Sequence, residues 1–151
     1  MLKSVFTSPL GKIVAVADEI GICSLDFDAD ATLVSSQNPH LQQLECELNE
    51  YFEGKRQRFE VSLNPKGTPF QMAVWRILCD IPYGHTISYS QEAQMLSHPT
   101  AMRAVANANG KNPIPVVIPC HRVIAKGGGL GGYSGGLWRK ELLLELEQTN
   151  R

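Results

Sequence analysis

The sequence predicts a protein of the α/β class (α+β) in two parts. Residues 1–66 are expected to form a small N-terminal domain of strands and one helix, and residues 67–151 a mainly helical C-terminal domain with a helix-turn-helix. Short β-prone runs near the start, one helical apolar stripe and two later capping-box motifs indicate this division. A chain of 151 residues is long enough to bury a hydrophobic core without disulfides.

The N-terminal domain is predicted to open with a β-hairpin. Residues 4–17 hold two β-prone runs around a Pro9-Leu10-Gly11 turn, and a third strand starts at Gly21. After a polar loop, apolar residues recur at helical spacing until Gly54, which predicts a helix with one apolar face: Leu41, Leu44, Leu48, Tyr51 and Phe52. A linker over residues 56–67 is expected to contain a short strand at residues 59–63.

The C-terminal domain begins with the sequence Thr68-Pro69-Phe70-Gln71, a capping box with proline at the first helical position. This helix must end near Ile81-Pro82. Ser88-Tyr89-Ser90-Gln91 starts a second, short helix to about Leu96, and Thr100 is placed to cap another through Ala108. Two short helices joined by about four residues are typical of a helix-turn-helix.

The second helix of this motif is rich in small residues and carries one long cation, Arg103. Small side chains allow a helix to lie close to a DNA groove. They also allow it to pack closely against the protein core, and the pattern alone leaves both interpretations open.

Charge divides unevenly between the two halves. Residues 1–67 carry 6 Lys and Arg against 10 Asp and Glu, whereas residues 68–151 carry 8 against 5. This asymmetry favours a polyanionic partner for the second half, although charges also segregate by chance on ordinary surfaces.

Four cysteines stand at positions 23, 46, 79 and 120, without the spacing of a disulfide framework or a zinc site. We therefore expect free thiols, no metal and no cofactor. No apolar run approaches the ~20 residues of a membrane helix, and no signal-peptide stretch is evident. These features predict a cytoplasmic protein without a membrane partner.

Cys120 differs from the other cysteines in its surroundings. A brief apolar strand at residues 116–118 is predicted to lead into it, a glycine-rich loop follows, and His121 and Arg122 come directly after it. Nearby cations stabilise a thiolate, which is the nucleophilic form of cysteine. In extended chain, Cys120 and His121 would point to opposite faces, so their contact needs a turn or a bridging water. His121 also needs an orienting partner. Glu145 and Glu147, on a last helix predicted over residues 137–148, are the candidates, and the pattern does not choose between them.

Pro119-Cys120-His121-Arg122-Val123 resembles the active-site signature of the O6-alkylguanine-DNA alkyltransferases, the methylated-DNA–protein-cysteine methyltransferases. The resemblance covers essentially all of residues 68–151 and is looser before them. Three further blocks fall where that family has them: Arg103-Ala104-Val105, Asn112-Pro113-Ile114-Pro115 and Tyr133-Ser134-Gly135-Gly136-Leu137.

The resemblance implies a role for each matching residue. Cys120 would accept the alkyl group, His121 would act as its base through a water, and Glu147 would orient His121. Asn112 would hold the active-site turn, and Tyr89 would help neutralise charge on the departing guanine. Arg103 would fill the gap left by the flipped nucleotide. The resemblance also implies DNA contacts by Thr100 and Ala104, and a base pocket made by Val123, Tyr133 and Ser134. Arg122, in the basic second half, is a candidate for a contact with DNA phosphate or for a structural contact.

The function that the resemblance implies is repair of double-stranded DNA containing O6-alkylguanine, by irreversible transfer of the alkyl group to Cys120 of a monomer. Two alternative functions differ from this one in the residues that they require. A non-enzymatic sensor of alkylated DNA would lack the acceptor cysteine, which is present here. A cysteine hydrolase would turn over and would have no use for Arg103 on a small-residue helix.

Overall fold

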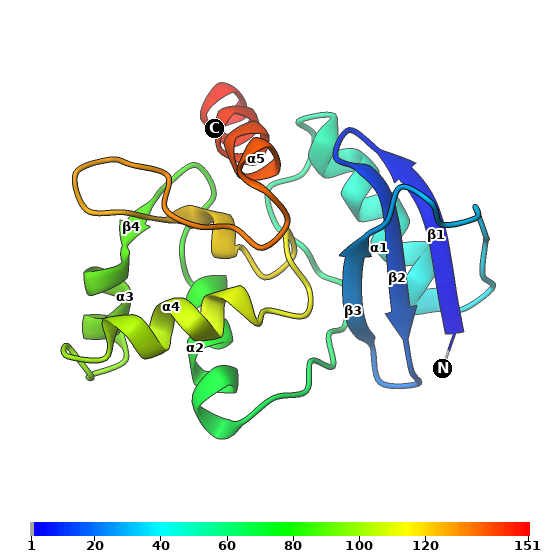
Figure 1. The fold of residues 1–151 in the computed structure, drawn as a ribbon. Helices are drawn as coiled ribbons and strands as arrows, with labels where there is room; N and C mark the ends of the chain where they lie inside the picture. The colour runs from blue at the N-terminus through cyan, green and yellow to red at the C-terminus, as the bar shows by residue number, and fades with distance from the viewer. Residues whose placement is uncertain (1) are drawn as a thin grey trace. The chain divides into compact units, whose positions relative to one another are not determined.

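A computed structural model of the chain describes residues 2–151. These residues divide into two compact units, of which the first ends at Lys66 and the second begins at Gly67. The first combines a sheet with one long helix, and the second is mainly helical (Figure 1). The predicted combination of strands and helices is therefore confirmed.

The N-terminal unit is an antiparallel sheet with one helix. Strands β1 (Leu2–Ser8), β2 (Gly11–Ala17) and β3 (Ile22–Phe27) follow one another in the sheet, and Ser8 pairs with Gly11 across the predicted turn. Helix α1 (Pro39–Phe52) packs against this sheet, and its first turn is capped by Asn38, whose side chain accepts from the Leu41 N–H.

The core of this unit lies between the sheet and α1. The predicted apolar face of the helix is buried at Leu41, Leu44, Leu48 and Tyr51. The strand expected at residues 59–63 is reduced to a single bridge between Ile22 and Leu63. Instead, the buried carboxylate of Glu47 accepts the N–H groups of Glu60 and Val61, at 2.9 and 3.1 Å.

The C-terminal unit is mainly helical and contains one short parallel ladder of two strands. Helices α2 (Pro69–Cys79) and α3 (Tyr89–Met95) both begin with complete capping boxes, as predicted. Both helices pack against α4 (Met102–Gly110). The remaining elements are β4 (Ile87–Ser88), which pairs with β5 (Val123–Ile124), the 3₁₀ turn η1 (Cys120–Arg122) and α5 (Leu137–Asn150).

Two local expectations in this unit are wrong. Helix α4 starts at Met102 with Ala101 as its N-cap, so Thr100 is not the capping residue. Residues 116–118 form a turn rather than a strand, because the Ile118 N–H donates to the Ile114 carbonyl oxygen at 2.9 Å. Val116 has a φ of 74°, a left-handed conformation that costs a β-branched residue conformational energy.

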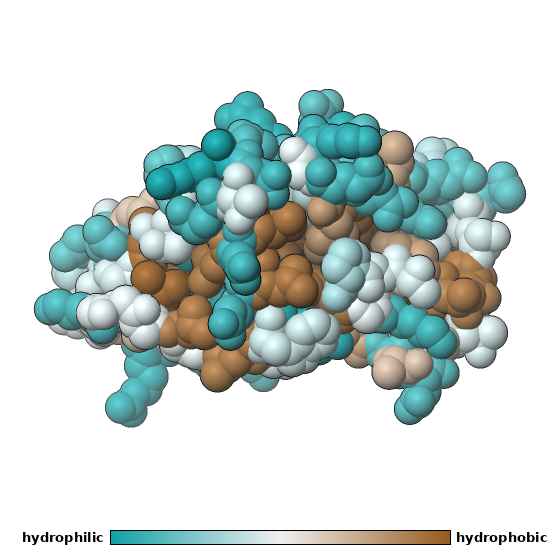
Figure 2. Space-filling view, turned by 90° about the horizontal axis from the view of Figure 1, so that it is seen from above, coloured by the Kyte–Doolittle hydropathy of each residue, from teal (hydrophilic) through white to brown (hydrophobic). Residues whose placement is uncertain are grey.

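The exposed surface mixes residue types. On the face drawn in Figure 2, hydrophobic and hydrophilic residues are interspersed. Within residues 2–151, no helix has the length and apolar character needed to cross a membrane.

Candidate active site

Cys120 begins the 3₁₀ turn η1 and is only 8% exposed. The turn is held by its own backbone, since the Arg122 N–H donates to the Pro119 carbonyl oxygen at 3.0 Å. Consecutive residues of a 3₁₀ helix are about 120° apart rather than on opposite faces. The turn therefore removes the obstacle that an extended chain would place between Cys120 and His121.

His121 is fully buried and is hydrogen-bonded to α5. Its Nε2 lies 2.7 Å from Oε2 of Glu147, whose side chain is also buried. Glu145 is exposed, so of the two candidates the structure brings Glu147 to the imidazole. The other ring nitrogen, Nδ1, is buried and has no partner among residues 2–151.

Arg122 makes structural contacts, and of its two candidate roles the contact with DNA phosphate is wrong. Its guanidinium is buried, and Nε and Nη2 donate to the two oxygens of Glu147 at 2.8 and 3.0 Å. Nη1 donates to the Ile81 carbonyl oxygen at 2.7 Å. Arg122 therefore fixes the position of the Glu147 carboxylate, which is bound to His121, and favours its ionised form.

These contacts set the charge states of the pair. Burial would raise the pKa of Glu147, but the hydrogen bonds from His121 and Arg122 and the positive charge of Arg122 lower it well below its usual range. Burial lowers the pKa of His121, against the opposing effect of Glu147. The resting pair is thus a carboxylate and a neutral imidazole, which is the form that accepts a proton.

Asn112 closes the segment that precedes the nucleophile. Its Nδ2 donates to the Ile118 carbonyl oxygen at 2.8 Å, and its Oδ1 accepts from the Ile114 N–H at 2.9 Å. The two bonds span the turn that contains the strained Val116. The side chain of Asn112 also favours the thiolate form of Cys120 by hydrogen bonding.

The thiol of Cys120 is protonated at rest, contrary to what its cationic neighbours in the sequence suggested. Burial raises the pKa of Cys120 to about 11, and Asn112 and the charge of Lys140 offset this only in part. The expected cations do not reach the sulfur, because Arg122 is committed to Glu147 and His121 is neutral. Alkyl transfer therefore requires a proton acceptor at the moment of reaction.

Lys140 is a buried cation that the sequence interpretation missed. Its Nζ donates to the carbonyl oxygens of Val123 and Gly132, at 2.7 and 3.1 Å, and thereby ties α5 to β5 and to the glycine-rich loop. Helical spacing offered a signal, because Lys140, Leu143 and Glu147 lie at i, i+3 and i+7 on the buried face of α5.

Two tyrosines and the glycine-rich loop complete the surroundings of Cys120. A Cβ atom at Gly131 would lie 2.9 Å from the Tyr89 hydroxyl oxygen, so the loop passes Tyr89 at a distance that only glycine allows. The hydroxyl of Tyr133 is buried and has no partner within residues 2–151. Burial raises the pKa of both tyrosines, and formation of the Cys120 thiolate raises it further, so both hydroxyls stay protonated during the reaction.

The remaining predicted residues divide between the pocket and α4. Val123 is buried, with its N–H bonded to the Cys120 carbonyl oxygen, whereas Ser134 is exposed. Thr100, Arg103 and Ala104 are all exposed. Helix α4 buries its other side, Val105, Ala108 and Asn109. The two interpretations of this helix are therefore compatible, since one face packs against α2 and α3 while the other is free for a groove.

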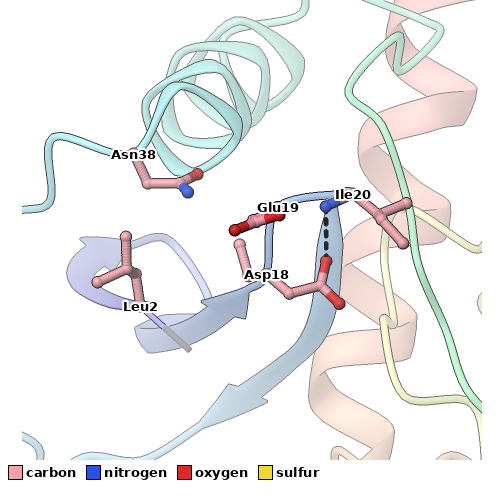
Figure 3. A pocket seen from close by; sticks show the side chains of 6 residues that line it. Leu2, Asp18, Glu19, Ile20 and Asn38 are labelled. Carbon is pink, nitrogen blue, oxygen red and sulfur yellow. Dashed lines mark hydrogen bonds between the residues drawn. The ribbon is translucent and has the colours of Figure 1, made fainter.

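A hollow of about 510 Å³ in the N-terminal unit contains none of the predicted site residues. It lies beside the turn after β2, where the Asp18 carboxylate accepts the Ile20 N–H at 2.9 Å, and the side chains of Leu2, Glu19 and Asn38 surround it (Figure 3). The contacts of Asp18 account for a tight turn. Within residues 2–151, no cluster of His, Cys, Asp and Glu side chains is arranged to hold a metal ion.

Comparison with known proteins gives consistent matches in both units. Residues 69–149 match the model of the 6-O-methylguanine DNA methyltransferase DNA binding domain, and residues 1–65 match that of its ribonuclease-like domain. The chain is 41% identical to the methylated-DNA–protein-cysteine methyltransferase of Methanosarcina barkeri, and 40% identical to that of Methanosarcina mazei; both alignments cover 99% of each chain.

Solved structures agree with these matches. The chain is similar to Mycobacterium tuberculosis OGT in complex with DNA, with a TM-score of 0.89 and 38% identity over 98% of this chain and 93% of that one. It is also similar to an O6-methylguanine DNA methyltransferase from Methanococcus jannaschii, with a TM-score of 0.73 and 31% identity over 97% and 94% of the two chains.

Proposed function

The chain belongs to the methylated-DNA–protein-cysteine methyltransferase family, whose DNA-repair reaction transfers a methyl group to a cysteine of the protein itself, and we propose that Cys120 is that cysteine. The substrate is O6-alkylguanine in double-stranded DNA. One observation supports this assignment above all. Cys120 and His121 are adjacent and buried on a 3₁₀ turn, and Nε2 of His121 lies 2.7 Å from Oε2 of the buried Glu147. DNA binding and alkyl acceptance both belong to residues 67–151.

The reaction begins with loss of the thiol proton. Burial holds the pKa of Cys120 at about 11, so the free thiolate is scarce near neutral pH. The imidazole of His121 is neutral, and its buried Nδ1 has no hydrogen-bond partner among residues 2–151. A water between Nδ1 and Sγ of Cys120 can pass the thiol proton to the imidazole. The Glu147 carboxylate stabilises the imidazolium that results.

The sulfur then displaces guanine from the alkyl carbon. The S–C bond forms as the C–O6 bond breaks, and the electron pair of the broken bond stays on the guanine. A protonated Tyr89 hydroxyl and the backbone N–H of Ser134 stabilise this developing charge. The product is a thioether that no side chain of the site can cleave, so each molecule acts once.

The base must leave the duplex to reach a buried sulfur. Flipping costs a few kcal/mol and is easiest for a weakly paired, damaged base. Exposed Arg103 on α4 enters the stack in its place, with Thr100 and Ala104 along the same groove. The carbonyl oxygen of Val123, already bound to Lys140, reads the guanine edge with Ser134, and Tyr133 lines the pocket.

The protein acts as a monomer in the cytoplasm. Its four cysteines are all free thiols in the structure, which fits a reducing compartment. Few cations other than Arg103 are placed to meet phosphate, so non-specific DNA affinity should be modest, around micromolar or weaker, and should fall as salt is added.

Intact mass and a peptide map, after incubation with duplex DNA carrying one O6-methylguanine, test the proposal. We expect a gain of one methylene, confined to the Cys120 peptide and saturating at one per protein. Lesion binding without any gain would favour the alternative of a damage sensor. Repeated turnover without a stable adduct would favour a hydrolase.

A further inference from the structure

Glu92 is a fully buried acidic residue that the proposed reaction does not use. It lies in the first turn of α3, and its side chain is 0% exposed. Its Oε1 accepts a hydrogen bond from Nδ2 of Asn109 on α4, at 2.7 Å, in a buried contact. The pair therefore joins the two helices of the helix-turn-helix from inside.

In each of these two side chains, one oxygen lacks a hydrogen-bond partner. Oε2 of Glu92 and Oδ1 of Asn109 are both buried, and neither has a partner among residues 2–151. Both atoms are oxygens, and two acceptors cannot satisfy each other without a hydrogen between them. A single proton on Oε2 would satisfy both, because a carboxylic acid and a carboxamide form two reciprocal hydrogen bonds.

The surroundings of Glu92 also favour the neutral acid. The charged side chains on the helices packed against α3 are Arg76 on α2 and Arg103 on α4, and both are exposed; β4 and β5 carry none. Burial raises the pKa of Glu92 to about 7, and the bond from Asn109 only partly opposes this. A buried carboxylate without a cation is costly, whereas a hydrogen-bonded acid is not.

We propose that Glu92 carries a proton in the folded protein and forms with Asn109 a doubly hydrogen-bonded acid–amide pair that holds α3 and α4 in the geometry needed for alkyl transfer. This inference rests on the proposed function. Tyr89 precedes Glu92 by three residues on α3, and Arg103 lies on α4 with Asn109. The pair is therefore a positioning element for the two residues that act on the target base and on the stack.

Ionisation of Glu92 opposes the reaction in two ways. It places two acceptor oxygens, one of them charged, against each other between the helices. Its negative charge also raises the pKa of Tyr89 and of Cys120, which disfavours the thiolate. Raising the pH should therefore have two opposing effects on alkyl transfer. Deprotonation of Cys120 favours the transfer, whereas ionisation of Glu92 slows it.

The first test compares the single-turnover transfer rates of Glu92→Gln and the natural protein between about pH 6 and pH 9. Glutamine keeps one acceptor and supplies one donor to Asn109 at every pH. Cys120 and His121 titrate in both proteins, so the ratio of rates isolates the effect of Glu92 ionisation, which includes its effect on the pKa of Cys120. We expect a ratio near one at the acidic end and a several-fold rise above about pH 7.

The control is Glu145→Gln, at an exposed position on α5, whose rate ratio to the natural protein should stay constant over the same range. A constant ratio for Glu92→Gln as well would overturn the proposal.

The second test needs no activity. Carbon-13 NMR of the glutamate carboxyl groups, assigned with Glu92→Gln, should show Glu92 titrating near pH 7, and the amide protons of Asn109 should shift with it. A Glu92 carboxyl already ionised at about pH 5 would overturn the acid–amide pair. A protein that shows this titration but never gains an alkyl group would instead contradict the proposed function.

Discussion

The two units of the chain differ in how completely their buried polar side chains are hydrogen-bonded. In the N-terminal unit, the Glu47 carboxylate is used fully: Oε1 accepts two backbone N–H groups, and Oε2 accepts from Gln43 at 2.8 Å. Within residues 2–151, the buried side-chain nitrogens and oxygens that lack a partner all belong to the C-terminal unit, and include atoms of Glu92, Asn109, His121 and Tyr133.

This difference in hydrogen bonding distinguishes buried groups that stabilise the fold from buried groups that are available for a reaction. A fully bonded buried group stabilises a structure, whereas an unused donor or acceptor is costly unless a water, a proton or a ligand completes it. Nδ1 of His121 and the hydroxyl of Tyr133 belong to the surroundings of Cys120. Two of these unpartnered groups therefore lie at the site to which we assign alkyl transfer, and the other two, on Glu92 and Asn109, lie between α3 and α4.

The largest expected effect is at the nucleophile. We expect Cys120→Ser to abolish alkyl transfer, because a serine hydroxyl is far harder to deprotonate than a thiol, while binding to lesion-containing DNA persists. Intact mass and a DNA-binding titration measure the two properties separately. Cys46→Ser, an exposed position in the N-terminal unit, should transfer normally. Loss of transfer in that control would contradict the assignment of alkyl transfer to the C-terminal unit alone.

Glu147→Gln should cost both activity and stability. It leaves the Arg122 guanidinium buried without its carboxylate, for which we expect a loss of about 3–5 kcal/mol in the free energy of unfolding. The transfer rate of the folded fraction should fall roughly 10²-fold or more, since His121 loses its orienting anion. Urea denaturation and single-turnover kinetics give the two values. Glu145→Gln, exposed on the same helix, should change neither.

Glu47→Ala should affect stability alone. It removes the acceptor for the N–H groups of Glu60 and Val61, and we expect a loss of about 2 kcal/mol in unfolding free energy. The transfer rate per folded molecule should match that of the natural protein. Glu45→Ala, a partly exposed neighbour on α1, serves as the control in the same urea titration. A slower transfer step in Glu47→Ala would show that the N-terminal unit does more than support.

The smallest effect is the response of stability to acid. The pKa of His121 is lowered by folding, so the unfolded chain binds the extra proton, and unfolding free energy should fall as pH drops below about 6.5. The pKa of Glu147 is also lowered, so its contribution is present above about pH 4.5 and is lost as pH falls below that value. Each proton contributes at most about 1.4 kcal/mol per pH unit.

Urea denaturation at a series of acidic pH values measures this response. His121→Asn should remove the first part of the slope, between about pH 6.5 and pH 4.5, and leave the second. An unchanged slope in that variant would mean that His121 is not buried as a neutral imidazole.

The secondary structure could be predicted wherever a local rule applied. The hairpin around Pro9–Gly11 and the two capping boxes were confirmed, because turn and cap chemistry depends on a few adjacent residues. Predictions failed where distant groups compete for the backbone. Residues 59–63 form no strand because Glu47, on another element, takes the N–H groups of Glu60 and Val61.

The same limit applies to the site. Local sequence identified Cys120 and His121, but it could not choose between Glu145 and Glu147, which differ only in the face of α5 that they occupy. It also could not choose between a DNA-phosphate and a structural contact for Arg122, whose side chain the fold buries against Glu147 and the Ile81 carbonyl oxygen. It gave no role to Lys140, since a lysine is buried only where carbonyl oxygens from other segments converge on it.

The sequence by itself determined the elements and the reactive pair, because propensity, capping and a motif act over a few residues. Only the tertiary structure decided which charges are buried and with which partners. Those contacts join segments as distant as His121 and Glu147, and burial raises the pKa of the Cys120 thiol and lowers that of the His121 imidazole. Protonation depends on the solvent that the whole fold excludes, and no stretch of sequence contains that information.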